Sequence, residues 1–84
     1  MNSRHRKTLE AVFAEPTKTN IAWADIEALL ISAGCKVLEG SGSRVRFEYG
    51  GLIAFFHRPH PRKEAIRYQV KEAREFLTEM GITP

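Results

Sequence analysis

Two histidines and two arginines in the middle of the chain are of the types that take part in RNA cleavage. His57 and His60 are separated by two residues, and Arg44 and Arg46 precede them on a segment of alternating charged and apolar residues. Cleavage of RNA without a metal ion needs a base near the 2′-hydroxyl, an acid near the leaving oxygen and cationic donors around the phosphate, and histidine and arginine supply these groups. The alternative is that His57 is a polar residue on a solvated strand and His60 a loop residue.

The spacing of His57 and His60 also fits a pair of metal ligands, but the surrounding sequence disfavours this interpretation. Pro59 keeps the segment extended, no cysteine adjoins it, and no third ligand is in sequence reach. The stretch GSGS at positions 40–43 lacks the lysine and the preceding hydrophobic strand of a phosphate-binding P-loop. We therefore expect no metal, no cofactor and no nucleotide hydrolysis.

The charge of the chain favours a polyanionic partner. Its 84 residues include 13 Lys and Arg against 10 Asp and Glu, which gives a net charge of +3. Basic residues gather at the N-terminus and around the two histidines, namely Arg4, Arg6, Lys7, Arg44, Arg46, Arg58, Arg62, Lys63 and Arg67. This distribution favours nucleic acid over a membrane surface, although solubility alone also accounts for a charge of this size.

Cysteine usage and hydropathy set the expected compartment. The single cysteine, Cys35, cannot form an intramolecular disulfide. No segment approaches the roughly 20 apolar residues that span a bilayer. We expect a soluble, cytoplasmic protein with no membrane partner, in which Cys35 is a small buried hydrophobe rather than a reactive thiol.

The segment before the histidines predicts a β-hairpin with Gly50 and Gly51 as its turn. Glycine accepts positive φ at both positions of a two-residue turn, and such a turn determines the register of the strands. The pairs expected on the face that packs on helices are Tyr49–Leu52, Phe47–Ala54 and Val45–Phe56. The pairs expected on the opposite face are Glu48–Ile53, Arg46–Phe55 and Arg44–His57. An open sheet face should therefore bring two arginines, an aromatic ring and a histidine together.

Two helices and a short strand are expected before the hairpin. Residues 4–14 carry a short apolar stripe at helical spacing, which Pro16 closes. Asn20 is a candidate N-cap for a second helix, which Gly34 ends. Residues 36–39 then form a brief strand.

A last helix is expected after the hairpin. It begins near Lys63 or Glu64, because the two prolines before it hold the chain extended, and Gly81 ends it. The chain length supports one small core. The element order predicts an α+β fold in which a three-stranded antiparallel sheet has helices packed on one face, with an extra N-terminal helix.

The order and spacing of several motifs resemble the HicA toxins of bacterial and archaeal toxin–antitoxin systems. The resemblance covers about residues 20–82 and rests on Ala33-Gly34, Gly42-Ser43, the hairpin, the run His60-Pro61-Arg62-Lys63-Glu64 and the final Gly81-Ile82. It implies a double-stranded-RNA-binding-like fold over residues 20–84, preceded by a basic N-terminal extension over residues 1–19. It also implies ribosome-independent cleavage of mRNA that arrests translation, and a HicB antitoxin that covers the active face and helps to repress the operon.

One position departs from the family pattern. The catalytic histidine of the family normally follows the Gly-Ser pair, and this chain has Arg44 there. A guanidinium binds phosphate well but is a poor general base near neutral pH. We hypothesise that His57, predicted to lie across the ladder from Arg44, is the acid–base residue and that Arg44 is the phosphate clamp. His60 is a second candidate, since it matches the family's own histidine in the H-P-x-K-E segment.

Three functions from different classes fit these residues. The first is an mRNA-cleaving toxin, whose further RNA contacts would be Ser43, Arg46, Phe55, Arg58, Arg62 and Lys63. The second is an RNA-binding module without catalysis, which the arginine at position 44 favours. The third is a partner-binding domain in which exposed Ile53 and Phe55 form a docking patch. The sequence indicates neither the RNA sequence preference nor the oligomeric state.

Overall fold

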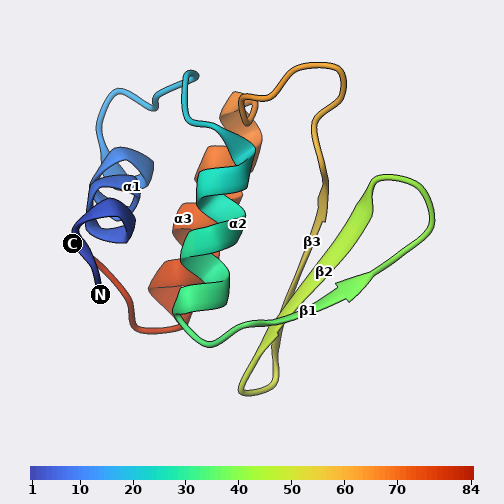
Figure 1. Ribbon diagram of the computed structural model, residues 1–84. Coiled ribbons are helices and arrows are strands. Elements are labelled where there is room, and N and C mark those ends of the chain that lie inside the picture. The colour runs from blue at the N-terminus through green and yellow to red at the C-terminus, as the bar shows by residue number, and fades with distance from the viewer.

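The computed structural model describes all 84 residues and contains three helices and three strands. In chain order these are α1 (Ser3–Phe13), α2 (Trp23–Ser32), β1 (Lys36–Glu39), β2 (Arg44–Tyr49), β3 (Leu52–His57) and α3 (Arg67–Glu79). Helices α2 and α3 lie between α1 and the sheet (Figure 1). None of the helices has the length and apolar character that crossing a membrane requires. The predicted α+β class with an additional N-terminal helix is confirmed.

The three strands form an antiparallel sheet in the order β1-β2-β3. The turn between β2 and β3 has Gly50 at φ 52° and Gly51 at φ 88°, which glycine adopts without strain. All six predicted pairs of this hairpin are present, from Tyr49–Leu52 at the turn to Arg44–His57 at the far end. The turn thus determines which side chains share the open face.

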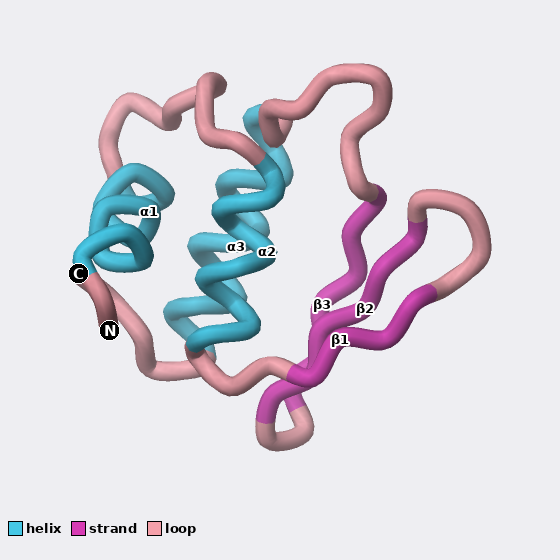
Figure 2. Tube along the Cα trace, viewed as in Figure 1, coloured by secondary structure: helices cyan, strands magenta, loops and turns pink.

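One hydrophobic core lies between the helices and the inner face of the sheet (Figure 2). Its aromatic centre is Trp23 of α2, whose ring centroid lies 5.0 Å from that of Phe56 and 6.3 Å from that of Phe47. The three rings meet at steep angles, an arrangement that aromatic pairs favour. Because all the helices lie on the inner side of the sheet, its outer face is left open.

Helix α1 belongs to this same core. Its residues Leu9 and Val12 are buried, and the helix contacts both α2 and α3. Arg74 of α3 donates hydrogen bonds to the carbonyl oxygens of Val12 and Ala14, at 3.0 and 3.2 Å, and so caps the C-terminal end of α1. The N-terminal segment therefore packs with the rest of the chain as one unit.

The start of α2 differs from the prediction. Its N-cap is Ala22, which makes no side-chain cap hydrogen bond, so the assignment of Asn20 as N-cap is wrong. The N–H of Trp23 instead donates to the carbonyl oxygen of Lys63 at 2.8 Å, and Ala22 forms a β-bridge with Glu64. This long-range pairing satisfies a backbone donor that would otherwise need a local cap.

Helix α3 begins at Arg67, so the predicted start near Lys63 or Glu64 is also wrong. The preceding residues are held by the same long-range pairing, in which the N–H of Ala65 donates to the carbonyl oxygen of Ile21 at 2.8 Å. Backbone pairing with a distant segment therefore replaces what would have been the first turn of this helix.

Candidate active site

The outer face of the sheet carries His57 and Arg44, two of the three residues that the sequence suggests for catalysis. Side chains alternate between the two faces of a strand, so every second residue points outward. These are Lys36 and Leu38 on β1, Arg44, Arg46 and Glu48 on β2, and Ile53, Phe55 and His57 on β3. Three cations and one histidine share this face with a single carboxylate, and the face is therefore suited to a polyanion.

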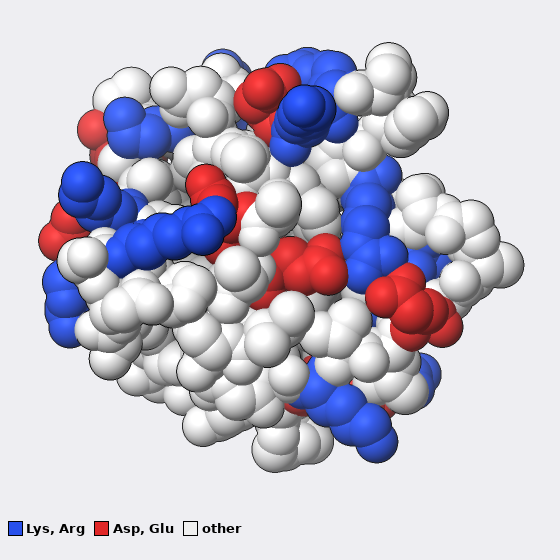
Figure 3. Space-filling view, in the orientation of Figure 1, with Lys and Arg blue, Asp and Glu red and all other residues white.

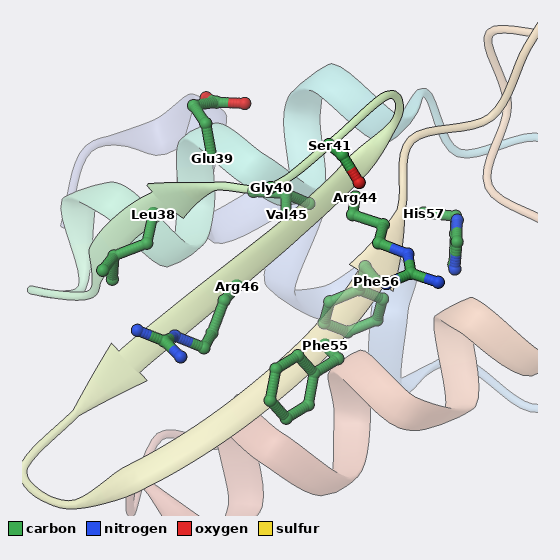
Figure 4. A pocket seen from close by; sticks show the side chains of 10 residues that line it. All are labelled: Leu38, Glu39, Gly40, Ser41, Arg44, Val45, Arg46, Phe55, Phe56 and His57. Carbon is green, nitrogen blue, oxygen red and sulfur yellow. The ribbon is translucent and has the colours of Figure 1, made fainter.

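A hollow of about 510 Å³ lies at one end of this face, beside the turn between β1 and β2 (Figure 4). It is lined by Arg44, Arg46, Phe55 and His57, together with residues of β1 and of the turn. A volume in this range accommodates a small ligand. The hollow, referred to below as the basic hollow, is thus large enough for a short part of a polynucleotide.

Arg44 and His57 face each other across the ladder between β2 and β3. The carbonyl oxygen of His57 points away from β2, since it accepts a hydrogen bond from Nε2 of Gln69 at 2.7 Å. The pair is therefore of the non-hydrogen-bonded kind, in which Cα atoms are about 4.5 Å apart and side chains are close. In Figure 4 the guanidinium of Arg44 extends towards the imidazole of His57. A permanent cation and an acid–base group are thus presented side by side.

Ser43 lies beside the imidazole of His57. The hydroxyl oxygen of Ser43 lies 3.4 Å from Nδ1 of His57. This distance exceeds that of a good hydrogen bond, but catalytic hydrogen bonds are often long before substrate binds. Contact at Nδ1 leaves Nε2 as the ring nitrogen available for proton transfer with a substrate.

The turn between β1 and β2 holds the backbone of Arg44. The N–H of Gly40 donates to the carbonyl oxygen of Arg44 at 2.9 Å, and the N–H of Arg44 donates to that of Ser41 at 3.2 Å. A Cβ atom on Gly40 would lie 2.9 Å from Cβ of Arg44, which is too close for two carbon atoms. Glycine at position 40 therefore permits the close approach that fixes Arg44 at the rim of the basic hollow.

Gln69 of α3 supports His57 from the other side. This side chain is buried, with 3% of its surface exposed. Its Nε2 donates to the carbonyl oxygen of His57, and its Oε1 accepts from the N–H of Ile66 at 3.1 Å. Both groups of the amide are satisfied, as a buried polar side chain requires. Gln69 thus ties the end of β3 to the start of α3.

Arg46 is the second arginine of the open face and is partly engaged. Its Nε lies 3.0 Å from Oε2 of Glu48, which is two residues further along the same strand. The contact is an ion pair without hydrogen-bond geometry, because Nε has no hydrogen-bond partner. Ion pairs on the surface contribute about 0–1 kcal/mol, so a phosphate group can compete with Glu48 for this guanidinium.

Arg58 follows His57 directly, and its guanidinium is used within the fold. It donates two hydrogen bonds to Glu27 of α2, at 3.0 and 2.9 Å, and two to Glu39 of β1, at 2.6 and 2.9 Å. These hydrogen bonds lower the pKa of both carboxyl groups and raise the pKa of Arg58. A phosphate would have to displace two carboxylates to bind here, which argues against Arg58 as an RNA contact.

The remaining predicted residues, His60, Arg62 and Lys63, lie on the segment between β3 and α3. They are exposed and do not line the basic hollow. Figure 3 shows Lys and Arg side chains gathered at the top of the molecule, where this segment runs in Figure 1. No group of three or more His, Cys, Asp and Glu side chains is arranged to hold a metal ion. Site residues thus fall into two groups, one on the sheet and one on this segment.

Sequence reasoning missed three residues that the structure adds to the site. Lys36 and Leu38 reach the open face because β1 pairs with β2, in a register that places Leu38 opposite Arg46. The sequence Lys-Val-Leu-Glu of β1 does not alternate between polar and apolar residues, so it gave no signal for the direction of these side chains. The turn between β1 and β2 is longer than two residues and did not determine the register. No local pattern marks Gln69, whose role depends on the packing of α3 beside β3.

The segment from α2 to α3 has the arrangement of a double-stranded-RNA-binding-like domain, with two helices on one face of a three-stranded antiparallel sheet. A family model described as "HicA toxin of bacterial toxin-antitoxin" matches residues 23–82, which is most of the chain. The chain therefore belongs to the HicA toxin family, whose members are toxins of toxin–antitoxin systems, generally ribonucleases, and pair with antitoxins. Neither a curated protein nor a solved structure matches the chain.

Proposed function

We propose that this protein is an endoribonuclease that cleaves mRNA without a metal ion and thereby arrests translation. The observation that carries the proposal is the pairing of His57 with Arg44 on an open, basic sheet face. Membership of the HicA family supports it, since these toxins are generally ribonucleases. An mRNA substrate would place the activity in the cytoplasm.

The proposed reaction uses the 2′-hydroxyl of the RNA as nucleophile. Nε2 of His57 accepts the proton of this hydroxyl as its oxygen forms a bond to phosphorus. The bond from phosphorus to the 5′-oxygen breaks, and that oxygen leaves with the electron pair and takes a proton from solvent water, because His60 does not line the basic hollow. The products are a 2′,3′-cyclic phosphate and a 5′-hydroxyl end. General acid–base catalysis of this kind contributes roughly 10²- to 10⁴-fold.

Arg44 has a different role in this proposal. Its guanidinium stays protonated and presents several N–H donors in a plane, which suits the oxygens of a phosphate. Beside His57 it would hold the scissile phosphate and stabilise the charge that develops in the transition state. Arg46 and Lys36 lie on the same face and would bind neighbouring phosphates.

A HicB-type antitoxin is the proposed protein partner. Members of the family pair with antitoxins, and the open face exposes 51% of Ile53 and 68% of Phe55. Exposed apolar residues of this size commonly mark contact sites. An antitoxin seated on this face would cover His57 and Arg44 and so block access of RNA.

The second candidate function is RNA binding without cleavage. The observation that favours it is Arg44 itself, which occupies the position of the family's catalytic histidine and does not act as a base near neutral pH. In that case the cationic face would bind RNA, and His57 would be one more polar contact.

Incubation of a defined mRNA with the purified protein in EDTA tests both functions. We expect cleavage that leaves 2′,3′-cyclic phosphate ends. The rate of cleavage by His57→Ala should be lower than that of the wild type by roughly 10²-fold or more. His5→Ala is the matched control, because His5 lies on α1, outside the basic hollow. A folded His57→Ala protein that cuts at the wild-type rate would refute the proposed role of His57. Binding without any cleavage by the wild type would establish the second function instead.

A further inference from the structure

Phe55 stands between two hollows of opposite charge. On one side is the basic hollow with Arg44, Arg46 and His57. On the other side is a groove of about 370 Å³ between β3 and α3, which is lined by Ile53, Ala54, Phe55, Glu72, Glu75, Phe76 and Glu79. Phe55 is exposed and is a lining residue of both. The sign of the surface charge therefore changes across this one side chain.

The three glutamates on the far side of Phe55 carry uncompensated charge. Glu72, Glu75 and Glu79 are spaced so that they lie along one side of α3. None of them takes part in any of the five ion pairs of the structure. In a chain of net charge +3, this strip is a local anionic border to the basic face.

We propose that the sheet face selects single-stranded RNA. One unpaired base stacks on Phe55 beside the phosphate held at Arg44 and His57, and the glutamates of α3 repel the second backbone that a duplex would bring. The inference rests on the proposed function, in that it assigns the scissile phosphate to the basic hollow.

The position of Phe55 on its strand places the stacked base next to the reacting phosphate. Phe55 and His57 are two residues apart on the same face of β3, which corresponds to about 7 Å along the strand. The base on Phe55 therefore belongs to a nucleotide that adjoins the phosphate at His57. Aromatic side chains on open sheets bind unstacked bases of single-stranded RNA in this way.

A duplex fails at this face for two reasons. A base inside a duplex is stacked on both sides by its neighbours, so Phe55 has no free base surface to contact. Where a duplex held by Arg44 and Arg46 extends across Phe55, its second backbone meets the glutamate strip. Charges within about 8 Å interact at physiological ionic strength, so the strip would repel these phosphates.

Binding of 2′-O-methyl RNA tests the stacked base without cleavage, since its 2′-oxygen has no proton to lose. We expect Phe55→Ala to weaken binding of a single-stranded oligonucleotide by about 5- to 100-fold. Phe55→Trp should retain the affinity, and Phe55→Leu should lose it. Ile31→Ala is the control, because Ile31 is half exposed on α2 and lines neither hollow. Unchanged RNA affinity in Phe55→Ala overturns the proposal and assigns the ring to protein contact.

Replacement of the glutamates tests the exclusion of duplex. The triple variant Glu72→Gln, Glu75→Gln and Glu79→Gln should raise affinity for a 2′-O-methyl hairpin duplex more than affinity for the single strand. Glu75→Gln and Glu10→Gln make the same change in net charge, but only Glu75 lies beside Phe55. Equal duplex-to-single-strand ratios in these two variants, or a wild type that prefers duplex, would overturn the proposal.

These outcomes separate the inference from the proposed function. If the wild type cuts no RNA but binds single strands in a manner dependent on Phe55, the cleavage proposal fails and the selection of single strands stands. If the wild type cuts duplex and single-stranded RNA equally, and Phe55→Ala does not change this, the proposed selection of single strands is wrong and the cleavage proposal stands.

Discussion

Replacement of Arg58 by methionine should destabilise the fold, because its half-buried guanidinium links separate elements. Arg58 joins three elements, because it lies just after β3 and donates to Glu27 on α2 and Glu39 on β1. Methionine keeps the apolar stem of the side chain and removes the four hydrogen bonds. The change therefore isolates the contribution of the guanidinium.

The expected magnitude follows from the exposure of the two carboxylates. The side chain of Glu27 is 20% exposed, and it also accepts from Nε1 of Trp23 at 2.9 Å. Hydrogen bonds to such a charged group contribute about 1.5–3 kcal/mol. Loss of the Arg58 guanidinium leaves the partly buried carboxylate of Glu27 with Trp23 as its single donor. Glu39 is 65% exposed, so solvent screens its pair with Arg58 and this pair adds little to stability. We expect Arg58→Met to lower the free energy of unfolding by about 2–3 kcal/mol.

Thermal and denaturant unfolding at pH 7 measure this loss. For a domain of this size the expected change corresponds to a decrease in Tm of roughly 10–20 °C. Glu39→Gln removes only the exposed pair and should lower the free energy of unfolding much less than Arg58→Met does. Arg58→Lys keeps the charge but cannot hold both carboxylates in a bidentate manner. Its loss in free energy of unfolding should therefore lie between those of Arg58→Met and Glu39→Gln.

The loss should also depend on pH in a defined direction. Hydrogen bonds from Arg58 hold the pKa of Glu27 and of Glu39 below the ordinary value of 4.5. A lowered pKa in the folded state contributes stability that is present above the unfolded value and is lost as pH falls through the folded value. The difference between wild type and Arg58→Met should thus be largest at neutral pH and shrink below about pH 4. A difference no larger than that of Glu39→Gln, or one that grows in acid, would refute the reasoning.

Two further variants test the support of the site and its charge. Gln69→Ala should lower the free energy of unfolding by about 2 kcal/mol, because it leaves the N–H of Ile66 and the carbonyl oxygen of His57 unpaired. It should also reduce the rate of cleavage more than the affinity for RNA. Denaturant unfolding measures the first effect, and single-turnover cleavage assays measure the second. Lys36→Ala should reduce the salt dependence of RNA affinity, with the log–log slope decreasing in size by about 0.7 if Lys36 binds one phosphate. An unchanged slope would remove Lys36 from the RNA-binding face.

The hairpin and its two faces were predictable from the sequence because their determinants are local. Gly50 and Gly51 define the turn, and the period of two in the strands then assigns every side chain to a face. The opposition of Arg44 and His57 follows from this register alone. The family resemblance was predictable as well, because it depends on motifs that are contiguous in the sequence.

The starts of α2 and α3 were not predictable in the same way. The start of α2 is set by pairing of Trp23 with Lys63, and that of α3 follows the pairing of Ala65 with Ile21, in both cases about 40 residues away in the chain. Local preferences for caps and prolines do not describe such long-range pairing. The role of Arg58 was missed for the same reason. Its partners lie on other elements, and a cluster of basic residues in the sequence does not show which cations are already paired.

The ladder position of Arg44 and His57 makes their roles exchangeable in principle, and this gives the most direct test of the relocated base. The exchange variant Arg44→His with His57→Arg restores the Gly-Ser-His motif of the family and keeps one cation and one imidazole on the same cross-strand pair. The single variant His57→Arg has two cations and no base at this pair, so it should lose cleavage. If the pair acts as a unit, the exchange variant recovers what the single variant loses, and the effects are non-additive. An exchange variant as inactive as His57→Arg, though folded and able to bind RNA, would show that position 57 is not an equivalent place for the base.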